Sequence, residues 1–240
     1  MTAPPLAQNV VIPKFGHGSD CVRNNDTFCW QWVKDNWHDK FQVHLIEHLE
    51  IVAIAMVFGF VIAFAAALFA YRQHWFETPF DTFANVLFTI PSIAAFQLLI
   101  PVTGITRLTI LIPLVAYSLL IMFRNTLTGL REVPDEVLEA ARGMGLTRRQ
   151  SLMRVELPLA VPAIIAGIRS ATVTIIGLGT IAALVVNQGL GVPIFEAIPT
   201  TFNTELIMGG LLAIGLAIAA DLILIVVQRV ATPWARRRVA

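Results

Sequence analysis

Long apolar runs separated by short polar segments dominate the pattern of this chain. A helix needs about 20 apolar residues to cross the hydrocarbon core of a bilayer. Backbone amides in lipid must be paired within their own segment, so each run is expected to be helical. The pattern predicts an all-α membrane protein with five transmembrane helices. They cover Leu49–Tyr71, Phe80–Pro101, Leu108–Phe123, Leu159–Val186 and Leu206–Val230.

Prolines and glycines interrupt several of these runs. Pro91, Pro113 and Pro162 lie inside the second, third and fourth runs, and Gly177–Gly179 lies in the fourth. Such breaks kink a membrane helix, and neighbouring helices tolerate them. Pro91 and Gly177–Gly179 are candidate hinges of a gate, or simply kinks accommodated by packing.

A polar segment, residues 131–158, separates the third run from the fourth. Asp135 follows Pro134 and is expected to cap a helix over Glu136–Arg142, with acidic side chains at its positive end. Gly143 is expected to break this helix. The first half of the segment is therefore predicted to form one short helix.

A second helix is predicted directly after the bend Gly143-Met144-Gly145-Leu146. Thr147 and Gln150 have the spacing of a capping box, and the helix is expected to end before Pro158. The bend would expose Met144 and Leu146 as an apolar tip on a polar loop. A flexible methionine at such a tip suits insertion into a groove on a partner protein.

The basic residues add a sidedness to this pattern. Hydrophobic residues make up 56% of the chain and charged residues 14%. The net charge of +1 hides the uneven distribution of charge and says nothing about nucleic acid, and no nucleic-acid partner is expected. If residues 131–158 face the cytoplasm, eleven of the seventeen Lys and Arg residues do so too, as the positive-inside rule requires. This inner set is Arg72, Arg124, Arg131, Arg142, Arg148, Arg149, Arg154, Arg229, Arg236, Arg237 and Arg238. We therefore expect the N-terminus outside and a cytoplasmic basic tail over residues 231–240.

The N-terminal tail, residues 1–44, is expected to lie outside without a signal peptide, translocated by the first span. Tryptophans and apolar residues recur in it at helical spacing, which predicts an amphipathic helix at the outer membrane interface. The alternative is a tail with incidental aromatic residues. The positions concerned are Trp30, Val33, Trp37, Phe41 and Leu45.

Both cysteines of the chain, Cys21 and Cys29, fall in this tail. An oxidising compartment would allow a disulfide between them, and two free thiols are the alternative. The tail also leads into a cluster of histidines and glutamates. Its members, His38, His44, His48, Glu47 and Glu50, are interpreted as charged flanks of a span rather than as metal ligands.

Two ionisable residues fall inside spans, where their cost makes them candidates for function. Arg169 lies about 16 Å above Pro158, and Asp221 lies about 14 Å from the inner end of the fifth span, at 1.5 Å per residue. The matching depths predict that the two side chains meet. A structural ion pair is the simpler role, and a pathway residue is the alternative. Polar candidates for lining a pathway are Ser92, Gln97, Asn125, Thr172 and Asn187.

The spacing of the polar segment resembles the EAA loop of ABC-importer permeases. Glu139-Ala140-Ala141 is followed at the family's intervals by Gly145, Val155 and Leu157-Pro158, with valine where isoleucine is commoner. The resemblance implies a type I ABC-importer permease fold and a coupling helix that docks on a cytoplasmic ATPase. The docking set would be Glu139, Ala140, Ala141, Gly143, Met144, Gly145, Leu146, Leu157 and Pro158.

Further strings, among them Phe123-Arg124-Asn125-Thr126 and Ala166-Gly167-Ile168-Arg169, resemble the branch that imports glycine betaine, carnitine and choline. Two stretches depart from that branch: Ile121-Met122-Phe123 lacks its usual proline, and Asn187-Gln188-Gly189 lacks its usual glycine-rich run. Methionine, or another amino acid or zwitterion, is the alternative solute class.

The family resemblance also implies the partners. They are a cytoplasmic ABC ATPase dimer that holds ATP and Mg, a second copy or a paralogous permease, an extracytoplasmic substrate-binding protein, and membrane lipid. The chain has no Gly-rich phosphate loop of its own, so it is expected to be a non-catalytic subunit of a bacterial plasma membrane. A secondary transporter or channel is the alternative class of function, and it would require internal repeats with paired broken helices. An intramembrane enzyme would require a set of catalytic residues within the spans.

Overall fold

The computed structural model describes residues 19–234, so the first part of the N-terminal tail and the Arg236–Arg238 cluster lie outside the described residues. Within residues 19–234 every regular element is helical. The elements are α1 (Asp20–Arg23), α2 (Trp30–Asp35), the π-helix η1 (Trp37–Gln42), α3 (Val43–Arg72), α4 (His74–Thr89), α5 (Ser92–Thr103), α6 (Arg107–Arg131), α7 (Asp135–Gly143), α8 (Arg148–Ser151), the π-helix η2 (Leu152–Glu156), α9 (Leu157–Ala182), α10 (Gly191–Thr200) and α11 (Asn203–Ala231).

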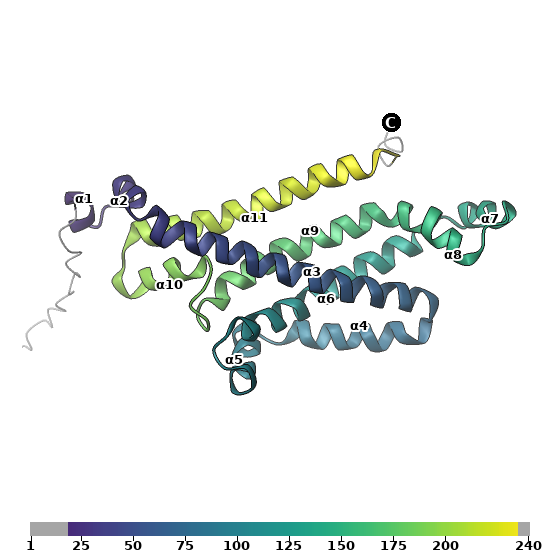
Figure 1. The fold of residues 1–240 in the computed structure, drawn as a ribbon, viewed down its shortest axis with the longest axis horizontal. Coiled ribbons are helices and arrows are strands. Elements are labelled where there is room, and N and C mark those ends of the chain that lie inside the picture. The colour runs from purple at the N-terminus through teal and green to yellow at the C-terminus, as the bar shows by residue number, and fades with distance from the viewer. Residues whose placement is uncertain (1–18, 235–240) are drawn as a thin grey trace, which may run out of the picture.

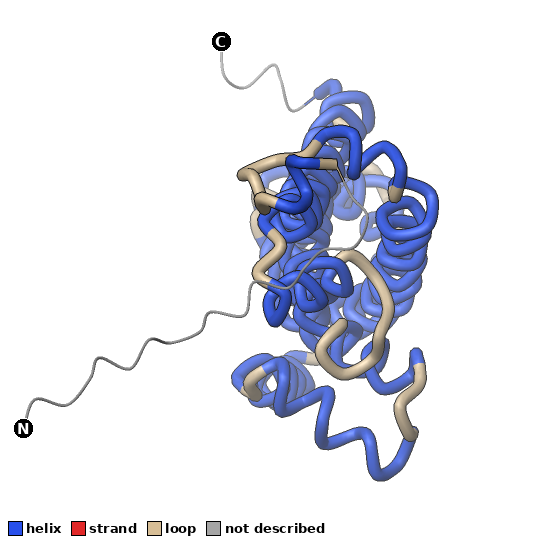
Figure 2. Tube along the Cα trace, turned by 90° about the vertical axis from the view of Figure 1, so that its left-hand side faces the viewer, coloured by secondary structure: helices blue, strands red, loops and turns tan. Residues whose placement is uncertain are grey.

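The long helices lie side by side, and the short elements gather at the two ends of the bundle (Figure 1). Figure 2 views the molecule from one of these ends, so that the long helices run along the line of sight. We call the end formed by α1, α2, α10 and the start of α11 the clasp end. We call the opposite end, formed by α7, α8 and the turn between α3 and α4, the loop end.

Among the described residues four helices are long and apolar enough to cross a membrane, and the bent pair α4–α5 makes five if it is counted as one span. The second run does not form the single helix expected over Phe80–Pro101, because α4 and α5 meet at an angle of 96°. Pro91 occupies the N-cap of α5 and forces Ile90, the residue before it, into an extended conformation. The proline therefore marks a sharp bend rather than a kink.

Other helix ends lie beyond the apolar runs because charged residues there find partners. α6 continues to Arg131, eight residues past the expected end at Phe123, beside two carboxylates of α4. Arg124 Nε donates to Asp81 Oδ1 at 2.6 Å, and Arg131 Nη1 donates to Glu77 Oε1 at 2.6 Å. Ion pairs between helices thus allow polar turns to stay helical.

Small residues hold the bundle together where its helices cross. One face of α3 is an alanine stripe buried against α6 and α4, formed by Ala63, Ala66, Ala67 and Ala70. Between α6 and α9, a Cβ added at Gly129 would lie only 2.6 Å from the Ala163 side chain. Because lipid is as apolar as a leucine core, close packing of small residues is what draws such helices together.

Candidate functional site

The polar segment folds around a glycine turn at the end of α7. Gly145 adopts a φ of +78°, Leu146 N donates to Ala141 O at 3.1 Å, and Gly145 N donates to Arg142 O at 2.9 Å. This pair of bonds is a Schellman motif, which needs a left-handed residue that glycine supplies without strain. The helix therefore ends where the sequence predicts.

The start of α7 differs from the prediction, whereas the start of α8 confirms it. Pro134, not Asp135, occupies the N-cap of α7, and Asp135 is its first helical residue without a capping hydrogen bond. Proline leaves that helix without a side-chain acceptor, so acidic residues support it through the helix dipole alone. At α8, Thr147 N donates to Gln150 Oε1 at 2.9 Å and Gln150 N donates to Thr147 Oγ1 at 3.4 Å, which closes the capping box.

The expected stop before Pro158 is wrong. Helical structure continues from Arg148 through η2 into α9, a stretch of 35 residues that ends at Ala182. The π-turn just before Pro158 is closed by a bond from Leu157 N to Leu152 O. A wider turn of this kind accommodates a proline, which cannot donate the regular bond.

Exposure within the loop is uneven. Met144 is 73% exposed and forms the tip, while Glu139 and Ala140 are also exposed. Ala141 is buried, and Leu146, Leu157 and Pro158 are half-buried. The loop thus presents a methionine and several carboxylates, Glu139 among them, beside a turn that its own backbone bonds keep in shape.

The structure brings Arg169 and Asp221 together in the seam between α9 and α11. Arg169 Nε donates to Asp221 Oδ1 at 2.9 Å, and Arg169 Nη2 donates to Asp221 Oδ2 at 3.1 Å. Gln228 Oε1 accepts a third bond from Arg169 at 3.3 Å, and its amide donates to Pro162 O at 3.1 Å. A bidentate ion pair, with Gln228 hydrogen-bonded beside it, therefore joins α9 and α11.

Comparisons with known proteins show the family to which this chain belongs. Residues 55–237 match the family described as "binding-protein-dependent transport system inner membrane component". The chain belongs to this family. It is the multi-pass permease subunit of an ABC importer, carried in the inner membrane.

Two relatives and one solved structure illustrate the likeness. The chain is 36% identical over 188 residues to the glycine betaine/carnitine/choline transport system permease protein OpuCB of Bacillus subtilis, covering 78% of this chain and 86% of the relative. It is 40% identical over 192 residues to the osmoprotectant import permease protein OsmW of Salmonella typhimurium, covering 78% and 89%. Its fold resembles a chain of the inward-facing MetNI methionine ABC transporter with a TM-score of 0.69 at 23% identity, covering 85% of this chain and 97% of that chain.

The five polar candidates for a pathway are dispersed over the permease. Thr172 Oγ1 and the Asn125 amide donate to carbonyls of their own helices, at 2.8 Å in both cases. Ser92 and Gln97 lie on α5, and Asn187 is exposed in the loop between α9 and α10. Within residues 19–234 no hydrogen bond joins any two of the five, so their role stays a prediction.

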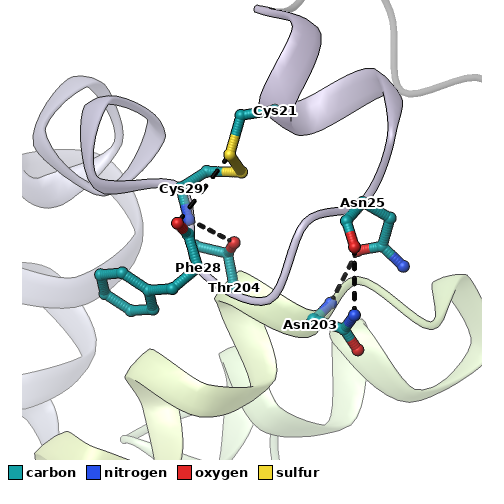
Figure 3. Close-up of a disulfide and its surroundings, with 6 residues drawn as sticks. All are labelled: Cys21, Asn25, Phe28, Cys29, Asn203 and Thr204. Atoms are coloured by element: carbon teal, nitrogen blue, oxygen red, sulfur yellow. Dashed lines mark hydrogen bonds between the residues drawn. A yellow bond between two sulfur atoms is a disulfide. The ribbon is translucent and has the colours of Figure 1, made fainter.

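The N-terminal tail of the permease folds back onto the start of α11 (Figure 3). A disulfide joins Cys21 and Cys29. Cys29 N donates to Thr204 Oγ1 at 2.9 Å, and Asn203 N donates to Asn25 Oδ1 at 3.0 Å. We call this disulfide-closed segment, residues 20–29, the clasp.

The aromatic stripe of the tail does not form the one helix expected. Its residues are divided among α2, η1 and the start of α3, and Val33 and Phe41 are buried in protein. Trp32, which lies outside the expected stripe, packs edge-on against Phe202 with ring centroids 4.7 Å apart. Part of the stripe is therefore packed in protein, while Trp30 stays exposed.

His48 is the residue that the sequence interpretation missed. It is 1% exposed, although it was expected in a charged flank, and its Nδ1 accepts from Leu190 N at 3.3 Å. A Cβ on Gly189 would approach its ring to 3.0 Å, and Glu47 accepts from Gly189 N at 3.0 Å. The sequence signal for this burial is the presence of glycine at the positions that pack against the ring, Gly189 among them.

The start of α6 joins the same network. Arg107 donates to Glu50 Oε2 at 2.9 Å and to Gln188 Oε1 at 3.1 Å. Glu47 and His48 of α3 thus bind the α9–α10 loop directly, and Glu50 does so through Arg107. We call these four residues the latch. Among the described residues no group of three or more His, Cys, Asp or Glu side chains has the geometry of a metal site.

Proposed function

We propose that this permease imports quaternary-amine osmoprotectants of the glycine betaine, choline and carnitine class. The observation that carries the proposal is the identity of 36–40% with permeases whose names state such solutes, over 78% of the chain. A methionine transporter shares the fold at 23% identity, which is a likeness of architecture. Solute selection would fall largely to a separate extracytoplasmic binding protein.

We propose that the loop end faces the cytoplasm and the clasp end the outside. Arginines cluster at the loop end, as the positive-inside rule requires of a cytoplasmic face. The disulfide lies at the opposite end, and disulfides persist in oxidising compartments. Residues 1–44 then form the extracytoplasmic part, residues 45–230 the transmembrane domain, and residues 231–240 a cytoplasmic tail.

The α7–α8 loop is the element through which the permease is driven. Met144 would enter a groove of the partner ATPase. Glu139 and the turn around Gly145 would contact the ATPase surface around that groove. ATP and Mg would bind to that ATPase, and the permease itself would carry out no hydrolysis. Closure of the two ATPases would move two such loops, one from each permease of a dimer, and switch the pathway between its inner and outer faces.

Arg169 and Asp221 serve in this proposal as a structural ion pair rather than as a binding site. Both carboxylate oxygens of Asp221 accept from Arg169, and Gln228 satisfies a further guanidinium hydrogen. An Asp221→Asn variant should therefore lose thermal stability. If it melts and assembles as the wild type does but no longer transports, a pathway role replaces the structural one.

Reconstitution tests the proposed function. The permease is placed in proteoliposomes with its ATPase and binding protein, and uptake of labelled glycine betaine, choline and methionine is measured. We expect ATP-dependent uptake of the two quaternary amines, and competition between them. Uptake of methionine alone would overturn the solute class, and uptake that persists without the ATPase would indicate a secondary transporter or channel.

A further inference from the structure

A cavity of ≈ 760 Å³ opens at the loop end, between the α3–α4 turn and the α7–η2 segment. One wall comes from the ends of membrane helices and the other from the loop that follows α6. Its lining residues are Tyr71, Arg72, Gln73, His74, Arg131, Leu138, Arg142, Leu146, Arg148, Arg149, Ser151, Leu152 and Glu156.

The cavity is strongly basic. Five arginines and one histidine line it, against the single carboxylate of Glu156. Arg131 is engaged by Glu77, but across the described part of the chain the other four arginines make no ion pair. Glu156 is only 7% exposed, so its carboxylate is largely withdrawn from the open space. Positive charge therefore stands in excess around an open space.

The cavity lies at the ends of three membrane helices, where a bilayer would place its headgroups. α3 ends at Arg72, α4 begins at His74, and α6 ends at Arg131, all on the cavity wall. Trp75, the next residue of α4, is 70% exposed, and tryptophan favours the membrane–water interface. Basic pockets between the ends of membrane helices are where lipid headgroups bind.

We propose that this cavity binds a phosphate group, carried by an anionic phospholipid or present as a free phosphate. The planar fork of arginine fits phosphate oxygens with paired hydrogen bonds. Arg72 stands on the wall of membrane helices, and Arg142, Arg148 and Arg149 stand on the loop wall. A phosphate bound between the walls joins the α7–α8 loop to the membrane helices. It therefore limits how far the loop can move when the partner ATPase moves.

An acidic surface of the partner ATPase is the competing occupant. Leu146 of the expected docking set lines the cavity, but Met144, the exposed tip of the loop, does not, whereas the ends of three membrane helices do. The position of the cavity therefore favours phosphate. The inference requires neither the proposed solute nor the proposed orientation, because both leaflets of a bilayer carry phosphates.

Native mass spectrometry of the purified full-length permease tests the site. Phosphatidylglycerol and zwitterionic phosphatidylcholine are titrated separately, and inorganic phosphate is added in a parallel thermal-unfolding series. We expect phosphatidylglycerol to bind more tightly than phosphatidylcholine. Arg72→Gln and Arg148→Gln, one on each wall, should each weaken that binding about fivefold.

Arg154→Gln is the matched control, because Arg154 is exposed on η2 but does not line the cavity. It should bind the lipid as the wild type does. A gain of melting temperature with inorganic phosphate alone, lost in the two cavity variants, would identify free phosphate as the source. An equal effect of all three variants would overturn the proposal, since it indicates general surface attraction. So would a loss of ATPase affinity in the cavity variants with no response to either phosphate probe.

Discussion

The two ends of this permease are built in opposite ways. At the clasp end, contacts join residues far apart in the chain: Asn25 reaches Asn203, Lys40 reaches Glu205, and Glu47 reaches Gly189. At the loop end, the fold of α7 and α8 rests on bonds between residues three to five apart. The difference teaches that one end is held by the tertiary structure, while the other carries its own shape and can be offered intact to a partner.

The sharpest test of this contrast changes the exposed tip. Met144→Glu should reduce ATP-driven transport about a hundredfold or more, because a carboxylate would enter a desolvated groove without a partner. The melting temperature of the isolated permease should stay unchanged, since Met144 is 73% exposed. Uptake in proteoliposomes and melting in detergent measure the two effects.

Met153→Glu is the matched control, because Met153 is also an exposed methionine but lies on η2. It should keep most of the transport activity. Equal losses in the two variants would contradict a specific docking role for the tip.

The latch should carry more stability than any residue of the loop. His48→Ala would leave a cavity beside Gly189 and remove the acceptor of Leu190 N, at a cost of about 2–3 kcal/mol. Thermal unfolding should show the loss. His44→Ala, which removes only a half-exposed contact to Glu47, should cost less than about 1 kcal/mol. Similar losses for both would mean that burial of His48 contributes little.

The disulfide should make the next largest contribution to the free energy of unfolding, after His48. A variant with Cys21→Ser and Cys29→Ser would release the loop between them, at a cost of about 2 kcal/mol in the chain-entropy view. Reductant should lower the melting temperature of the wild type and leave the double variant unaffected. Free thiols in the non-reduced protein, found by mass spectrometry, would remove the basis of this prediction.

The smallest effect separates two neighbouring glycines of the loop. Gly145→Ala should cost about 1 kcal/mol, because its φ of +78° disfavours a side chain although no atom lies within 4 Å of the added Cβ. Gly143→Ala, within the last turn of α7, should be neutral or slightly stabilising. Helix content and coupled ATPase activity report on both, and equal behaviour would contradict the glycine turn.

The features that the sequence predicts well depend on local chemistry or on simple length. The apolar runs place the spans, Gly145 and Thr147 define the loop, and equal depth along two helices suggests that Arg169 faces Asp221. Each of these requires knowledge of neighbouring residues or of the rise per residue alone.

The features that escape prediction depend on partners elsewhere in the fold. α6 extends beyond its apolar run because Arg124 binds Asp81, a residue 43 positions earlier in the chain. His48 counts as a polar flank until the loop 142 residues later closes over it. Pro91 signals a break, but the proline alone does not predict its size, which the structure shows as an angle of 96° between α4 and α5.

The unbroken helix from Arg148 to Ala182 makes the molecule a mechanical rod as well as a scaffold. Its 35 residues span about 50 Å, from the α7–α8 loop to the loop that the latch holds. If the α7–α8 loop docks on an ATPase as proposed, a displacement at this end would reach the far end as rotation or translation of one helix, with the π-turn at Leu152–Glu156 as its most compliant part. Pro158, a residue type that ends helices in most sequences, therefore lies inside the helix that would carry such a displacement.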